Sequence, residues 1–109
     1  TIENTADQLP NPAELFLGAF AACLLKNVER FSGLLHFDYD RASVQVSATR
    51  EARPPHLDDL QYELIIFSKD ERLNLELLKK NLEQYGTIFN TVQKACSITG
   101  SVIKKENYV

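Results

Sequence analysis

The stretch "NPAELFLGAFAAC", residues 11–23, is the most informative part of this sequence. It opens with a helix start: Asn11 suits the N-cap, because its side chain can accept a hydrogen bond from a free backbone N–H. Pro12 suits the first helical position, and Glu14 the third, where its carboxylate can reach back to the cap amide. The sequence therefore predicts that a helix begins at Asn11.

The predicted helix continues into a run of apolar residues, Leu15 to Leu25, interrupted only by Gly18. A helix that is apolar on every side is typically buried on most sides. Charged residues return after this run, and we expect the helix to reach about Ser32, with Gly33 as its stop. This segment is predicted to be a buried central helix.

The remaining segments predict an antiparallel hairpin, two helices and a last strand. Apolar and polar residues alternate at 43–49 and again at 60–66, as in half-buried strands. The segment "RPPHLDD" at 53–59 is predicted to be the turn between them. An amphipathic helix is expected over 69–85, ended by Gly86, and then a short helix over 87–95 and a strand over 96–105. The expected fold class is α+β, with the central helix wrapped by an antiparallel sheet.

Length and composition indicate one globular domain spanning residues 1–109. The net charge of −3 argues against a nucleic-acid partner. The apolar run is too short to span a bilayer, and residues 1–10 lack the pattern of a signal peptide. Two distant cysteines form neither a disulfide framework nor a metal cluster, so we expect a cytoplasmic protein with no cofactor and no metal. The chain begins with threonine and contains no methionine, so we expect its natural start to be missing.

Cys23 has two interpretations, a packing residue or a reactive thiol. Free cysteine is among the most buried residue types, and burial among apolar side chains keeps a thiol protonated and inert. Reactivity would require a nearby group that stabilises the thiolate. Lys26 and Asn27 lie three and four residues further along the same helix face, although Lys26 is expected to extend towards solvent.

Three other candidate side chains carry weaker signals. Cys96, at the start of the last predicted strand, is expected to be a packing residue, and a role as a substitute resolving cysteine is the weaker alternative. His36 and His56 lie in loop-like contexts without partners at ligand spacing. Neither histidine is predicted to be a metal ligand or a base.

The motif in residues 11–23 resembles the central-helix motif of the OsmC/Ohr family, the osmotically inducible and organic hydroperoxide resistance proteins. In that family an Asn-Pro-Glu-Glu-Leu type start leads through small and apolar residues to an Ala-Cys or Gly-Cys. The order of the following segments also matches, so the resemblance covers about residues 10–104. It implies an OsmC-like fold assembled as an intertwined homodimer.

The resemblance also implies a chemistry. Active members of the family are thiol peroxidases, and the cysteine that matches their peroxidatic position is Cys23. In those members a second cysteine on the later helix resolves the sulfenic acid. An arginine from the N-terminal region and a glutamate near the helix start activate the first thiol. Dithiol reductants recycle it.

This chain departs from the family pattern at the supporting positions. The position of the second cysteine is occupied by Gly86, and that of the glutamate by Ala13. Glu14 lies on the opposite side of a regular helix from Cys23, and capping already accounts for it. The arginine would belong to N-terminal strands that we expect this chain to lack. Only Cys23 is therefore carried over from the family as a candidate catalytic residue.

Two functions follow from these observations. The first is a one-cysteine, thiol-dependent organic hydroperoxide reductase, with peroxiredoxin-like activity in oxidative stress defence and an external thiol or dithiol as its reductant. The alternative is a non-catalytic OsmC-fold module that binds a small apolar ligand at the dimer cleft, with Cys23 merely packed. A peroxidase should show an accessible Cys23 beside a cation, whereas a binding module should show a cleft without charge at the sulfur.

Overall fold

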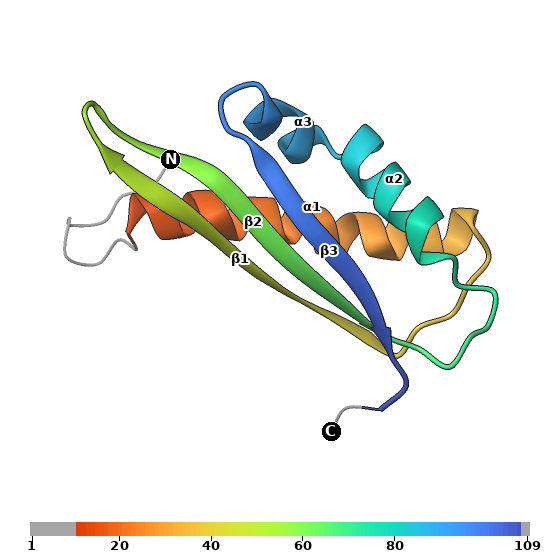
Figure 1. Ribbon diagram of the computed structural model, residues 1–109. Helices are drawn as coiled ribbons and strands as arrows, with labels where there is room; N and C mark the ends of the chain where they lie inside the picture. Colours follow the sequence, from red (N-terminus) through yellow and green to blue (C-terminus); the bar gives the residue numbers. More distant parts are fainter. Residues whose placement is uncertain (1–10, 108–109) are drawn as a thin grey trace, which may run out of the picture.

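The computed structural model describes residues 11–107, so the polar segment at 1–10 lies outside the described residues. Within residues 11–107, three helices and three strands follow one another in the order α1, β1, β2, α2, α3 and β3. The long helix α1 crosses one face of the sheet, and α2 and α3 lie beside it (Figure 1). This arrangement is the predicted α+β architecture.

Helix α1 spans Pro12–Leu34 and begins as the sequence predicts. The side chain of Asn11 accepts a hydrogen bond from the N–H of Ala13 at 2.8 Å, and Pro12 occupies the first helical position. The prediction that Gly33 stops the helix is wrong. The helix continues to Leu34 because the N–H of Leu35 still bonds to the carbonyl of Phe31, and the chain leaves the helical path at His36, which has a φ of 57°.

One face of α1 is buried, whereas burial on most sides was expected. The buried residues recur every three or four positions: Phe20, Leu24, Val28 and Phe31. Within the same apolar run, Leu15 and Phe16 are 52% and 38% exposed. The sheet and the other two helices cover only part of the circumference of α1, and the remainder is open in the single chain.

Strands β1 (Arg41–Ala52) and β2 (Pro55–Phe67) form the predicted antiparallel hairpin. Its turn is shorter than the expected 53–59, because Ala52 already pairs with Pro55. Proline is tolerated there because it is the first residue of its strand. The register shifts between Ser47 and Thr49, opposite a backbone bend at Asp59, whose φ is 49°.

The last strand, β3 (Ile98–Lys105), pairs with β2 in parallel, so the expectation of a wholly antiparallel sheet is wrong. Helices α2 (Leu75–Tyr85) and α3 (Thr87–Gln93) carry the chain back to the end of the sheet at which β2 begins. A strand that follows such a crossover runs in the same direction as the strand before it. The resulting order, β1-β2-β3, places β2 at the centre.

The core lies between the inner face of the sheet and the three helices. Strand β2 contributes every second residue, as expected for a strand with one covered face. The members from β2, α2 and α3 are Leu60, Tyr62, Leu64, Ile66, Leu78, Leu82, Phe89 and Val92. Helix α2 is shorter than the predicted 69–85: Asn74 caps it, and Leu73 is buried just before it begins.

Candidate functional site

Cys23 lies in the middle of α1, next to the buried Leu24, and its side chain is half-buried. Its sulfur faces the junction between α2 and α3, where Gly86 lies. A Cβ atom built on Gly86 would lie 3.2 Å from Cys23 Sγ and 3.0 Å from the Cβ of Phe89. A side chain at residue 86 would thus touch the sulfur. Gly86 is also the residue that the family resemblance predicts at the position of the second cysteine.

Asn27 is the hydrogen-bond partner of Cys23. Its amide nitrogen Nδ2 lies 2.8 Å from the carbonyl oxygen of Cys23 and 3.5 Å from Cys23 Sγ. The amide has two hydrogens, so it can donate one to each acceptor. A neutral donor therefore stands beside the sulfur.

Lys26 points away from the protein, as the sequence predicts. Its side chain is 82% exposed, and its ammonium group lies 4.0 Å from the carboxylate of Glu29. Exposed pairs of this kind contribute little to stability, and an ammonium group surrounded by water stabilises a half-buried thiolate weakly.

Glu14, His36 and His56 each contribute to a helix end or a turn. Glu14 is exposed in the first turn of α1, where its charge suits the positive end of the helix. His36 forms the bend after α1, and the ring nitrogen Nδ1 of His56 lies 2.6 Å from the carbonyl of Pro54 in the hairpin turn.

Cys96 is a buried packing residue, as predicted from the sequence. Its thiol donates to the carbonyl of Leu57 at 3.4 Å, and both cysteines are free. Burial raises the pKa of Cys96, and the negative charge of Asp58 adds to this shift. A raised pKa keeps the thiol protonated and unreactive at neutral pH.

The family model for OsmC-like protein matches residues 5–101. This chain belongs to the OsmC-like family. Solved structures share its fold at low sequence identity. An OsmC-like protein from Mycoplasma pneumoniae superposes with a TM-score of 0.79 at 16% identity, covering 93% of this chain and 77% of that one.

Two further structures carry names from the hydroperoxide resistance group. An organic hydroperoxide resistance protein OsmC from Legionella pneumophila matches with a TM-score of 0.72 and 16% identity, covering 90% of this chain and 72% of that one. OhrB, the organic hydroperoxide resistance protein of Bacillus subtilis, matches with a TM-score of 0.60 and 20% identity, covering 89% and 73%. A search of curated proteins gave no significant match. None of the helices in the described part of the chain has the length and hydropathy needed to cross a membrane.

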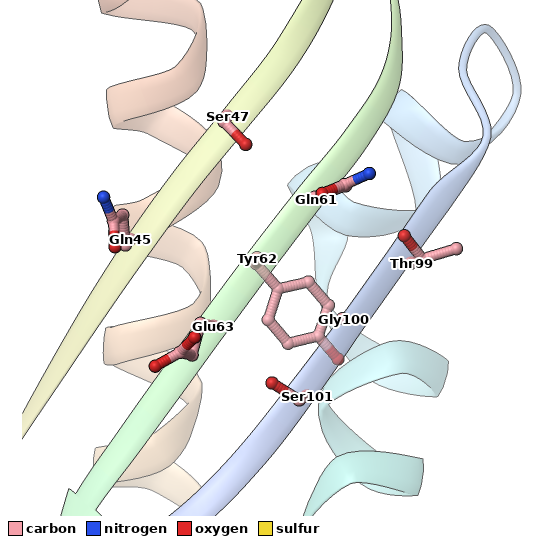
Figure 2. A pocket seen from close by; sticks show the side chains of 8 residues that line it. All are labelled: Gln45, Ser47, Gln61, Tyr62, Glu63, Thr99, Gly100 and Ser101. Carbon is pink, nitrogen blue, oxygen red and sulfur yellow. The ribbon is translucent and has the colours of Figure 1, made fainter.

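One hollow of this OsmC-like chain lies away from Cys23, on the face of the sheet opposite α1. It measures about 550 Å³, and its lining comes from all three strands: Gln45, Ser47, Gln61, Tyr62, Glu63, Thr99, Gly100 and Ser101 (Figure 2). The lining is mostly uncharged and polar, whereas apolar ligands favour apolar walls. A smaller hollow of about 330 Å³ lies between α1 and β1, and Ala22, Leu25 and Tyr39 are among its lining residues.

Tyr62 joins the sheet to α2 through a partly buried hydrogen bond. Its ring lies across Gly100 of the neighbouring strand, where a Cβ atom would overlap it (Figure 2). The Tyr62 hydroxyl donates to Glu83 at 2.6 Å, and Glu83 also pairs with Lys79 at 3.2 Å. Burial, with the bond and charge of Glu83, raises the pKa of Tyr62 well above its usual range.

Sequence reasoning anticipated part of this site. The i, i+4 spacing placed Asn27 on the same face as Cys23, but it did not show that the amide reaches the sulfur. Alignment singled out Gly86, and only the packing of α3 against α1 shows the contact with Cys23. The Tyr62–Glu83 bond joins separate elements and leaves no local sequence pattern.

Proposed function

We propose that this OsmC-like protein is a thiol-dependent organic hydroperoxide reductase that acts through Cys23 alone. The observation that carries the proposal is the position of this sulfur. It is half-buried beside an amide donor, and it faces a glycine rather than a second cysteine. The similarity to hydroperoxide resistance proteins supports the same reading.

The reaction proceeds in two stages. The Cys23 thiolate attacks the terminal hydroxyl oxygen of the hydroperoxide, an S–O bond forms as the O–O bond breaks, and the alkoxide that leaves takes a proton from water to become the alcohol. Sulfur loses two electrons and becomes a sulfenic acid. One molecule of an external thiol then forms a mixed disulfide and releases water, and a second thiol displaces Cys23 as a disulfide is released.

We propose that the protein acts as a homodimer. Leu15 and Phe16, which are exposed on the apolar part of α1, would be covered by a second copy. Burial of such residues in a dimer would also exclude water from the neighbourhood of the sulfur. A hydroperoxide with an apolar substituent would gain more from such a site than hydrogen peroxide would.

A second candidate function is a non-catalytic binding module for a small apolar ligand. One observation favours it: the hydrogen-bond donor at the sulfur is a neutral amide, and Lys26 is directed to solvent. In that case Cys23 is a packing residue, and its replacement leaves ligand binding intact.

The test is consumption of cumene hydroperoxide with dithiothreitol as the reductant. Replacement of Cys23 by serine should reduce turnover at least a hundredfold, because the hydroxyl group is not a peroxide-reducing nucleophile at neutral pH. The matched control, Cys96→Ser, should keep turnover within about twofold, since Cys96 is inert in the folded chain. Equal turnover by the wild type and Cys23→Ser would reject the reductase and favour the binding module.

A further inference from the structure

Asn27 stands next to the atom that the proposed reaction oxidises. Its Nδ2 atom contacts both the carbonyl oxygen and the sulfur of Cys23, four residues earlier on α1. The orientation of the amide is fixed by the first contact, because a carbonyl oxygen can only accept a hydrogen bond. The nitrogen, and not the amide oxygen, therefore faces the sulfur.

The second amide hydrogen responds to the charge of the sulfur. A thiol sulfur is a weak acceptor, whereas a thiolate accepts a charge-assisted bond of roughly twice the strength of a neutral one. The Asn27 contact hence stabilises the thiolate more than the thiol. Since the side chain is partly buried, water competes less for this donor than at an exposed site.

We propose that Asn27, a neutral amide, activates Cys23 by donating a hydrogen bond to its thiolate. The inference rests on the proposed function and adds the means of activation. Activation by a neutral amide differs from activation by a cation in its dependence on salt. Attraction between a thiolate and a partly exposed cation is weakened by salt, whereas a hydrogen bond from a neutral amide depends little on salt.

The structure offers a matched control for the loss of the amide. Asn81 on α2 donates from Nδ2 to the carbonyl of Leu77 at 2.8 Å, which is the same i to i−4 bond without a sulfur. Asn27→Leu and Asn81→Leu thus remove the same helix contact, and only the first removes a donor from Cys23. Asn27→Asp is a second variant of the same shape, which places a negative charge at the sulfur.

The experiment follows alkylation of Cys23 by iodoacetamide from pH 5 to 10, in the Cys96→Ser background. At pH 7 we expect Asn27→Leu to react roughly five- to tenfold more slowly than its parent and Asn27→Asp more slowly still, with equal rates at pH 10. Asn81→Leu should match the parent throughout, and the parental rate at pH 7 should change less than twofold between 50 mM and 500 mM salt.

Unchanged alkylation in both Asn27 variants, an equal loss in Asn81→Leu, or a steep dependence on salt would overturn the inference. These outcomes are separate from a failure of the proposed function. If Asn27→Leu slows alkylation while Cys23→Ser retains peroxide turnover, Asn27 tunes a thiol that is not the peroxidase nucleophile. If Cys23→Ser abolishes turnover and the Asn27 variants alkylate like the parent, the reductase stands without this means of activation.

Discussion

Gly86 shows how a single missing side chain shapes the candidate site. Its φ of −72° is ordinary for any residue, so glycine is not required there by the backbone. It is required by space, because a Cβ atom would lie 3.0–3.2 Å from Leu82 O, Phe89 Cβ and Cys23 Sγ. The junction of α2 and α3 can therefore approach the sulfur only because residue 86 lacks a side chain.

Replacement of Gly86 by alanine should destabilise the protein by about 1–3 kcal/mol, since the extra methyl group overpacks a filled site. Urea denaturation measures this change. The matched control is Gly33→Ala in α1, where nothing lies within 4 Å of the added Cβ and the helix should gain up to about 1 kcal/mol. Equal stability of the two variants would contradict the tight contact at Gly86.

At the scale of elements, the contact between β2, β3 and α2 depends on Tyr62 and Gly100. The ring of Tyr62 needs the space above Gly100 to bring its hydroxyl to Glu83 on α2. Glycine at residue 100 of β3 leaves the space through which the Tyr62 side chain of β2 reaches α2. Tyr62 thereby adds a hydrogen bond to the apolar packing between the sheet and α2.

Gly100→Ala should displace the Tyr62 ring and lower the free energy of unfolding by about 2–3 kcal/mol. Tyr62→Phe loses only the hydrogen bond and should cost about 1–2 kcal/mol. In a Tyr62→Leu background the same Gly100→Ala change should cost much less, because the ring that it displaces is absent. Additive costs in that double variant, measured by urea denaturation, would contradict the proposed overlap.

Most of these elements could be predicted because they depend on neighbouring residues in the sequence. The features that depend on packing between distant residues could not be predicted. Asn11 and Pro12 predicted the start of α1 because capping involves neighbouring residues only. The parallel direction of β3 was missed because the strand pattern of 98–105 is the same for either direction. The helix pattern predicted that Cys23 lies within α1, whereas its contact with Gly86 depends on the packing of helices separated by two strands.

At the scale of the whole molecule, Asp70 connects three parts of the chain. Its carboxylate accepts hydrogen bonds from the N–H groups of Asp38 and Arg72, each at 2.8 Å, and from the guanidinium of Arg72. Its own carbonyl accepts from Lys104 on β3 at 2.9 Å. The segments after α1 and β2 are thus joined to the last strand, and the bonds from Arg72 and Asp38 hold the pKa of Asp70 far below its usual value of 3.8.

A lowered pKa stabilises the fold wherever Asp70 is ionised, which includes every pH above about 4. That contribution is lost as the pH falls below 4 towards the pKa of the folded state, because the unfolded chain then binds a proton that the folded chain does not. Asp70→Asn should therefore be less stable at pH 7 and should lose less of its remaining stability between pH 4 and 2. The control variant Glu71→Gln changes an exposed neighbour and should lose as much stability between pH 4 and 2 as the wild type. The free energy of unfolding is measured by urea denaturation at each pH. An equal loss in Asp70→Asn and the wild type would contradict this role of Asp70.

The parallel pairing of β3 also affects the order in which the fold can form. The hairpin pairs residues close in sequence, beginning with Ala52 and Pro55, whereas β3 pairs Ile98 with the distant Leu60. Closing so long a loop costs chain entropy before any contact compensates for it, and contacts of high sequence separation slow folding. We therefore expect the hairpin to assemble early and the third strand to join later, once the crossover between β2 and β3 has been closed. Until then, one edge of β2 stays unpaired and open to association with other chains.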